Sequence, residues 1–305
     1  MELYRRTSPE TYSGRASNQN LYLHEKVLCV DVSSLEKSSD KRVALLGYAC
    51  DEGVKRNQGR LGAIKGPDTI RKKLGKLPNH LDDETALLDV GSIHCLNADL
   101  ETAQDKLAQQ VLGGGHDIAY GTYNGIKKHL GNSKSIGIIN FDAHFDLRSN
   151  ENGNTSGTPF YQIAKDCEAS NAAFHYLCLG IREDANDSSL FKTAKELEVK
   201  YILRDTFRIE FHNEINAWIN AFIQTVDVVY VTIDLDGFSS AYAPGVSAPS
   251  PMGFTPDVVL ASLKTIIASG KLTALDIAEL NPTYDIDGQT ARLAASLLHT
   301  LIHSL

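Results

Sequence analysis

Acidic and histidine side chains recur at every second position where two apolar segments of this chain end. Asp142, His144 and Asp146 follow one segment, and Asp234 and Asp236 follow another. Because successive side chains of a strand point to opposite faces, residues i and i+2 point the same way. Asp146 can fold back toward the same point as its strand unwinds. Burying carboxylates costs several kcal/mol unless their charge is compensated, so this spacing predicts a bound cation.

A third segment, GGGHD at 113–117, adds His116 behind glycines that permit close backbone approach. Four carboxylates and two neutral imidazoles carry a formal charge of −4, which two divalent cations would balance. Oxygen-rich ligands with some imidazole suit Mn²⁺, and two such ions roughly 3.5–4 Å apart can activate a shared water. The sequence therefore predicts two Mn²⁺ ions held by six residues: His116, Asp142, His144, Asp146, Asp234 and Asp236.

Each of these fragments has a simpler interpretation when taken alone. A single Asp-x-His or Asp-x-Asp is typical of a loop or a helix cap, and a histidine after three glycines is typical of a turn. The metal hypothesis depends on the fragments lying together at the ends of neighbouring strands.

The elements that must bring them together alternate between apolar strands and longer helical patterns, which is typical of a parallel sheet covered by helices on both faces. In such sheets ligands gather beyond the carboxyl ends of the strands. We expect a single α/β domain over 1–305, with an N-terminal extension over 1–40 and a polar loop at 148–158. The predicted strands are 42–49, 85–90, 109–114, 135–140, 174–181, 199–203, 226–234 and 272–280, and the predicted helices are 67–74, 98–108, 117–130, 187–197, 213–224, 256–269 and 288–304.

Composition excludes several other classes of protein. A net charge of −8 without a Lys/Arg cluster argues against nucleic acid as a partner. No run of 18 apolar residues predicts a membrane span, and the first twenty residues do not read as a signal peptide. Five scattered cysteines without a CxxC pair indicate reduced thiols in a cytoplasmic protein.

The motifs GGGHD, NFDAHFD, DLDGFSSAYAPGVSAPSP and ELNP, in this order, resemble those of the ureohydrolase family, which includes arginase, agmatinase and formimidoylglutamase. The resemblance extends to NQGRLGAIKGP and LLDVG and so covers nearly the whole chain. It implies a three-layer α/β/α fold with a mainly parallel sheet, a homo-oligomer, and a small amidine or guanidine substrate attacked by a metal-bridging hydroxide. The six residues named above each fall on a ligand position of that family.

Two residues, Glu279 and the ligand Asp146, also carry the chemistry that the resemblance implies. Glu279 of ELNP falls on the acid that holds the cationic head of the substrate. It can pair with two N–H groups of an amidinium, although a carboxylate satisfied at a turn is the simpler alternative. Asp146, if it touches the hydroxide, could carry a proton to the departing amine.

Three departures distinguish this chain from arginases and agmatinases. Gly115 replaces the acid of their GGDH motif, and Ser156 and Phe160 stand where those enzymes carry a proton-shuttling histidine. The Asp-Pro that follows the metal acids in arginases is also missing. All three departures resemble the formimidoylglutamase branch, which splits N-formimidoyl-L-glutamate into L-glutamate and formamide during histidine degradation.

A substrate with two carboxylates calls for cations in the pocket, and arginine forks suit carboxylates. We expect Arg148, Arg60 and Arg182 to serve this purpose, with hydrogen bonds from Asn154 and Ser156, although each arginine could instead be a solvated surface charge. Two other functions stay open. One is a different ureohydrolase activity on arginine, agmatine or a guanidino acid, and the other is a non-catalytic paralogue that keeps the fold.

Overall fold

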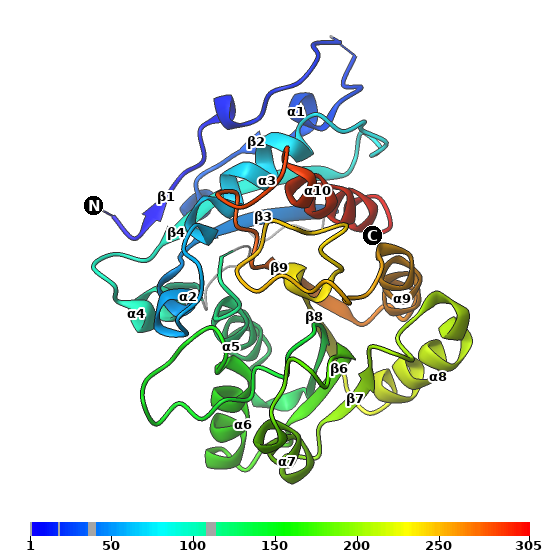
Figure 1. Cartoon of the computed structure of the whole chain (residues 1–305). Coiled ribbons are helices and arrows are strands. Elements are labelled where there is room, and N and C mark those ends of the chain that lie inside the picture. Colours follow the sequence, from blue (N-terminus) through cyan, green and yellow to red (C-terminus); the bar gives the residue numbers. More distant parts are fainter. Residues whose placement is uncertain (1, 18, 36–40, 108–113) are drawn as a thin grey trace.

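The computed structural model describes residues 2–17, 19–35, 41–107 and 114–305, which form two sheets covered by helices (Figure 1). Five parallel strands make the larger sheet in the order β7-β6-β5-β8-β9. In the smaller sheet, β3 and β2 run parallel to β4 and β1 runs antiparallel to it. The strands are β1 Tyr4–Arg5, β2 Leu28–Cys29, β3 Arg42–Ala49, β4 Ala86–His94, β5 Ile136–Phe141, β6 His175–Ile181, β7 Lys200–Leu203, β8 Val228–Asp234 and β9 Leu272–Ala278.

Helices cover both faces of the larger sheet, so the predicted α/β fold with a mainly parallel sheet is confirmed. Alternate strand residues such as Phe141 and Val231 face one core, which α3, α8, α9 and α10 complete. The residues between them, such as Ile138 and Tyr230, face a second core with α5, α6 and α7. The helices are α1 Leu23–Lys26, α2 Glu52–Arg56, α3 Gly66–Leu74, α4 Leu100–Leu107, α5 Ile118–Leu130, α6 Pro159–Ala169, α7 Ser188–Glu196, α8 His212–Ile223, α9 Pro256–Ala268 and α10 Gln289–Ile302.

Most of the predicted elements are confirmed to within a few residues, and the strand at 42–49 matches in full. The predicted strand at 109–114 lies outside the described residues except for Gly114. The helix α6 was missed, although its buried Phe160, Ile163 and Cys167 follow helical spacing from a proline at its first turn. The loop at 148–158 contains no helix or strand, as predicted.

The N-terminal segment is tied to the smaller sheet by a buried polar group. The Tyr12 hydroxyl donates to Asp89 Oδ2 over 2.6 Å, and Arg71 Nε donates to the same oxygen over 2.6 Å. Arg71 also donates to Ser92 Oγ and to the Gly91 carbonyl. A buried ion pair of this kind needs every partner, because removal of one leaves an uncompensated charge.

Among the described residues, none of the helices combines the length and the apolar character that crossing a bilayer requires.

Replacing Tyr12 by phenylalanine should lower the free energy of unfolding by about 1–3 kcal/mol, because the buried Asp89 carboxylate loses a donor. Equilibrium urea denaturation measures this change. Tyr161→Phe is the control, since no hydrogen bond of the Tyr161 hydroxyl is found among the described residues. Equal stability of the Tyr12 variant and the unchanged protein would mean that this contact does not hold the N-terminal segment in place.

Candidate metal centre

Two aspartates at the ends of β5 and β8 make the same local turn. Asp142 Oδ1 accepts the backbone N–H of His144 over 2.8 Å, and Asp234 Oδ1 accepts that of Asp236 over 2.7 Å. Such bonds from an Asp side chain to the amide two residues ahead are a common turn device. They anchor one oxygen of each aspartate and leave the Oδ2 atoms beside His116, at 3.2 and 3.1 Å from its Nδ1.

The six predicted ligands gather in two groups that share Asp142. His116, Asp142, Asp146 and Asp234 bring ligand atoms within 4.8 Å of one another, and so do Asp142, His144 and Asp236. His144 Nδ1 lies 3.4 Å from Asp142 Oδ1 and 3.3 Å from Asp236 Oδ1. Asp142 thus offers a different oxygen to each group, which is the arrangement of a carboxylate that bridges two cations.

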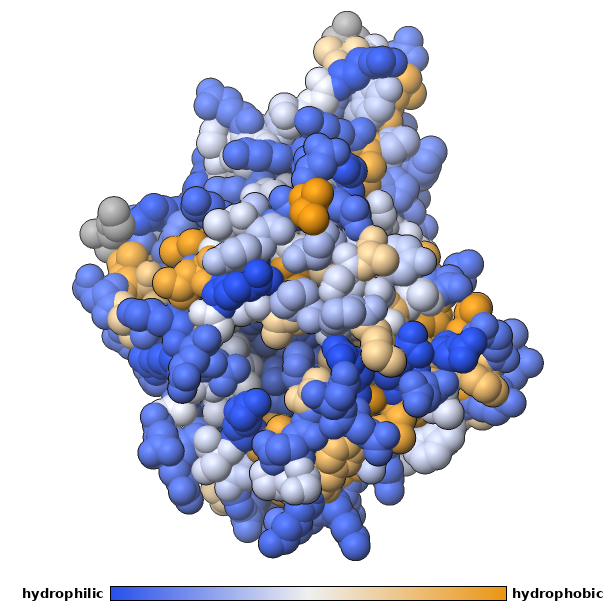
Figure 2. All heavy atoms as spheres, viewed as in Figure 1, coloured by the Kyte–Doolittle hydropathy of each residue, from blue (hydrophilic) through white to orange (hydrophobic). Residues whose placement is uncertain are grey.

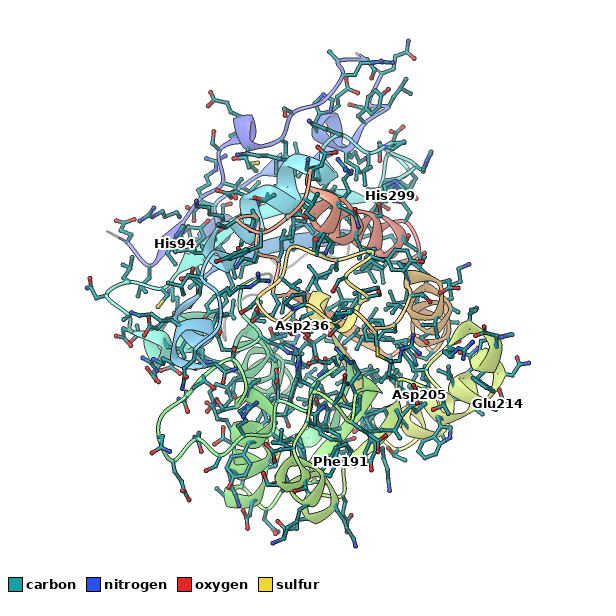
Figure 3. The ribbon with its side chains drawn as sticks, in the orientation of Figure 1. His94, Phe191, Asp205, Glu214, Asp236 and His299 are labelled. Carbon is teal, nitrogen blue, oxygen red and sulfur yellow. The ribbon has the colours of Figure 1, made fainter. Side chains whose placement is uncertain are left out.

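Two buried atoms of this cluster have no hydrogen-bond partner among the described residues: His116 Nδ1 and Asp236 Oδ1. Three carboxylate oxygens surround His116 Nδ1 at 2.8–3.2 Å, yet none is placed to accept a hydrogen bond from it. An imidazole lone pair and a carboxylate oxygen without donors are the groups that a divalent cation satisfies. The residues therefore fit a metal pair. Asp236 lies near the middle of the molecule, where the strand ends meet their loops (Figure 3).

A buried hydrogen-bond relay, formed by Thr232 and Asp276, fixes which ring nitrogen of His116 faces the cluster. His116 Nε2 lies 3.0 Å from Thr232 Oγ1, and the Thr232 hydroxyl donates to Asp276 Oδ1 over 2.5 Å. Since that hydroxyl proton points to Asp276, Thr232 can only accept from His116, so Nε2 carries the ring proton. The lone pair of Nδ1 then faces the carboxylates, and the relay orients the ligand as partners behind metal-bound histidines do.

The pKa values of the cluster reflect this crowding of charges. Burial raises the pKa of Asp236 well above its usual value, and Asp234 adds to the effect. Burial would lower the pKa of His116, but Asp234, Asp142 and Asp146 raise it well above its usual value. Both shifts favour the protonated forms of these two groups, so binding of divalent cations should compete with protons there.

Glu279 lies beside His116 and is held rigidly. It follows β9 with a left-handed φ of 66°, and its Oε1 accepts the His116 backbone N–H over 2.9 Å. Burial raises its pKa well above the usual value, and Asp234 adds to this. A left-handed non-glycine residue is uncommon and often marks a functional position.

The glycine that departs from the arginase pattern has a steric reason. A Cβ atom on Gly115 would lie 2.7 Å from Asp117 Oδ1 and 2.8 Å from Val54 Cγ2. Asp117 is buried and accepts a hydrogen bond from the Tyr48 hydroxyl over 2.8 Å. This segment therefore carries its acid, Asp117, after His116, whereas the GGDH motif carries its acid before the histidine.

A cavity of about 310 Å³ opens beside the cluster, and Figure 2 shows the molecule hollowed near the middle of this face. Arg148, Arg60 and Ser156 line it, as does Glu279. Other lining residues escaped the sequence analysis: Asn57, Gln58, Asn186 and Ser247. Asn57 and Gln58 begin the NQGRLG motif, so that motif already contained a signal.

Two predicted substrate residues, Arg182 and Asn154, do not line this cavity, contrary to the prediction that they bind the substrate. Arg182 donates through Nε and Nη2 to Asp184 over 3.0 and 2.6 Å. Asn154 Nδ2 donates to Glu101 Oε1 over 3.2 Å. Each side chain finds a carboxylate elsewhere, so neither is available to a ligand of the cavity.

The two arginines that line the cavity differ in their partners. Arg60 donates to the Ser247 and Val246 carbonyls over 2.9 and 2.5 Å, and its guanidinium lies 4.0 Å from the ring centroid of Tyr284. Two of its five guanidinium N–H donors thus hold the loop at 246–247. Arg148 is exposed, and its guanidinium has no hydrogen bond or ion pair within the described part of the chain.

The chain is similar to known proteins over nearly its whole length. The family model described as "Arginase family" matches residues 41–303. A formimidoylglutamase from Legionella pneumophila (strain Paris) is 40% identical over 98% of this chain and 97% of that protein. The crystal structure of formimidoylglutamase from Bacillus subtilis superposes with a TM-score of 0.80 at 23% identity, covering 96% of this chain and 93% of that one. A formiminoglutamase from Trypanosoma cruzi, whose crystal structure was solved with Mn²⁺, superposes with a TM-score of 0.77 at 24% identity. The superposition covers 89% of this chain and 95% of that one.

Replacing Thr232 by valine should weaken Mn²⁺ binding by about 10–100-fold, because His116 loses the partner that fixes its ring proton. Isothermal titration with Mn²⁺ measures the affinity. Thr232→Ser keeps the hydroxyl and should retain tight binding. A valine variant that binds Mn²⁺ as tightly as the serine variant would contradict the role of this relay.

Proposed function

This chain belongs to the arginase family, and we propose that it hydrolyses N-formimidoyl-L-glutamate to L-glutamate and formamide. The observation that carries this proposal is one cavity lined by the His/Asp cluster, by Glu279 and by the unpaired Arg148. An amidinium cation and a carboxylate are the two ends of such a substrate, and the cavity offers one group for each. The similarity to formimidoylglutamases over nearly the full chain supports the same assignment.

We propose two Mn²⁺ ions as the cofactor. His116, Asp146 and Asp234 would hold one ion, His144 and Asp236 the other, and Asp142 both. The ligand types support manganese, and the T. cruzi relative was solved with this metal. When bound, such a pair lowers the pKa of a water that it shares and so provides a nucleophile at neutral pH.

Glu279 would orient the amidine. Its Oε1 is engaged by the His116 amide, which leaves Oε2 to accept from the amidinium N–H groups. Because Glu279 is buried and fixed at both its backbone and its Oε1, the bound amidine carbon would be held next to the cluster. Positioning of this kind can contribute several kcal/mol to lowering the barrier.

Asp146 would carry the proton. In the reaction, water adds to the amidine carbon, the C–N bond to the glutamate nitrogen breaks, and that nitrogen takes up a proton. Asp146 lines the cavity, with 13% of its side chain exposed. Phe160 cannot replace the missing histidine, since its side chain has no ionisable group; its ring instead packs against His116 and stacks on Tyr176. A carboxylate at the reacting centre can act as such a general acid–base group.

Arg148 would bind a carboxylate of the substrate, with Ser156 beside it. An unpaired guanidinium can form a two-pronged pair with a carboxylate, whereas it would repel the second positive charge of agmatine. We therefore favour an acidic substrate over the cationic ones used by other members of the family. All five cysteines are free, which suits a reducing compartment such as the cytoplasm.

The function is tested by assaying Mn²⁺-loaded protein against four substrates: N-formimidoyl-L-glutamate, arginine, agmatine and 4-guanidinobutyrate. We expect kcat/KM for the first to exceed the others by at least 100-fold, because only this substrate offers an amidine together with two carboxylates. Equal or faster turnover of a guanidine would replace this assignment by another activity of the family. No turnover of any of them by metal-loaded protein would favour a non-catalytic role.

Replacing Arg148 by methionine should raise KM for N-formimidoyl-L-glutamate by about 10–100-fold, since a charge-assisted pair contributes about 1.5–3 kcal/mol. The number of bound Mn²⁺ ions should stay the same, because no hydrogen bond or ion pair among the described residues joins the Arg148 side chain to the cluster. Steady-state kinetics and metal analysis measure the two quantities. Arg182→Met is the matched control, since Arg182 pairs with Asp184 outside the cavity. Equal KM values in the two variants, or loss of metal in the Arg148 variant alone, would contradict this role.

A further inference from the structure

The backbone that carries His144 lies beyond the end of β5, and its polar groups are satisfied by side chains. The Cys178 thiol lies 3.5 Å from the His144 carbonyl, and the Tyr176 hydroxyl donates to the Phe145 carbonyl over 3.1 Å. Both residues belong to β6, the neighbouring strand. Buried backbone groups without a partner are costly, so a loop held in this way keeps one conformation.

Asn186, in the loop between β6 and α7, makes the most direct contacts with this segment. Its Nδ2 donates to the Ala143 carbonyl over 2.8 Å, and its Oδ1 accepts the Phe145 backbone N–H over 3.0 Å. Nδ2 also donates to the Arg182 carbonyl over 2.8 Å, which holds the side chain to its own loop. Asn186 is 6% exposed, so water competes little for these bonds.

These bonds extend the hydrogen bonding between β5 and β6 past the point where β6 ends. The Asp142 N–H donates to the Leu179 carbonyl, and the Arg182 N–H donates to the Ala143 carbonyl. Beyond Arg182 the chain turns away toward α7, and the amide of Asn186 takes the place that the next backbone unit of a strand would occupy. A primary amide has the same donor and acceptor as a peptide unit, which makes asparagine suited to this position.

The two contacts of Asn186 fall on the peptide units on either side of His144. Fixing both units leaves mainly the side-chain torsions of His144 free. Its Nδ1 must reach the oxygens of Asp142 and Asp236 to complete the second group. Distances between a metal and its ligands tolerate about 0.2 Å, so a small rotation of either peptide would spoil this geometry.

We propose that Asn186 is the positioning residue for His144, and that it sets the affinity of the second cation more than that of the first. The inference rests on the proposed cation pair. It predicts an asymmetric effect, because His116 reaches the first group from a different segment and is oriented by Thr232 and Asp276. A residue that only stabilised the fold would not distinguish the two cations.

The test compares Asn186→Ala and Asn186→Leu with Ala194→Gly. Leucine keeps the branching of asparagine at Cγ but has no amide, and alanine is a second variant should the larger leucine disturb folding. Ala194 is buried in α7 and has no polar side-chain atom, so its replacement by glycine lowers stability without removing a hydrogen bond to the 143–145 backbone. Titration with Mn²⁺, followed by electron paramagnetic resonance, counts the ions that form a spin-coupled pair. Thermal unfolding of the metal-free proteins measures stability.

Both Asn186 variants should bind the second Mn²⁺ at least 10-fold more weakly than the unchanged protein and show the spectrum of isolated Mn²⁺ at two equivalents. The first Mn²⁺ should bind within about 3-fold of its original affinity. Ala194→Gly should still bind the spin-coupled Mn²⁺ pair, even if its melting temperature is as low as that of the Asn186 variants or lower. Retention of the pair in the Asn186 variants, or equal weakening of both cations, would overturn this inference while leaving the proposed function intact. Absence of a pair in the unchanged protein would overturn both.

Discussion

The compensation of buried negative charge is the constraint on which the rest of the structure depends. The ends of β5 and β8 and the turn before α5 bring four carboxylates and two imidazoles to one point, and Asp142, Asp234 and Asp236 are almost fully buried there. Carboxylates this close repel one another, and burial penalises each of them further. Protons can relieve the repulsion only in part, because two ligand atoms still lack a partner. Two divalent cations match both the charge and the geometry.

The groups around this point divide into those that hold its geometry and those left for a ligand. Thr232 and Asp276 fix the ring of His116, and Asn186 contacts the backbone on both sides of His144. Donors and acceptors spent in this way are unavailable for binding. On the cavity side, the Arg148 guanidinium and Glu279 Oε2 have no hydrogen-bond partner within the part of the chain that the structure describes. A site built like this is rigid where the cations would lie and open where a charged substrate would enter.

The sequence predicted which residues form the cluster because acids and histidines recur where parallel strands end, and those ends lie at one edge of the sheet. The structure places His144, Asp146 and Asp236 in turns beyond β5 and β8, so side-chain alternation along a strand does not by itself produce the geometry. The hydrogen-bond and ion-pair partners of the side chains around the cluster could not be predicted in this way. Arg182 pairs with Asp184, two residues along the chain, and no pattern distinguishes this from a free arginine. Asn186 reaches a segment 41 residues earlier, and Asp276 reaches Thr232 across 44 residues. Such pairings depend on how the strands and loops pack.

Diffraction from crystals grown with Mn²⁺, recorded at the manganese absorption edge, tests the central claim most directly. The account predicts two anomalous peaks roughly 3.5–4 Å apart, one beside His116 and Asp146 and the other beside His144 and Asp236, with Asp142 touching both. Peaks that lie away from these side chains, or no peak at all in metal-loaded crystals, would contradict it.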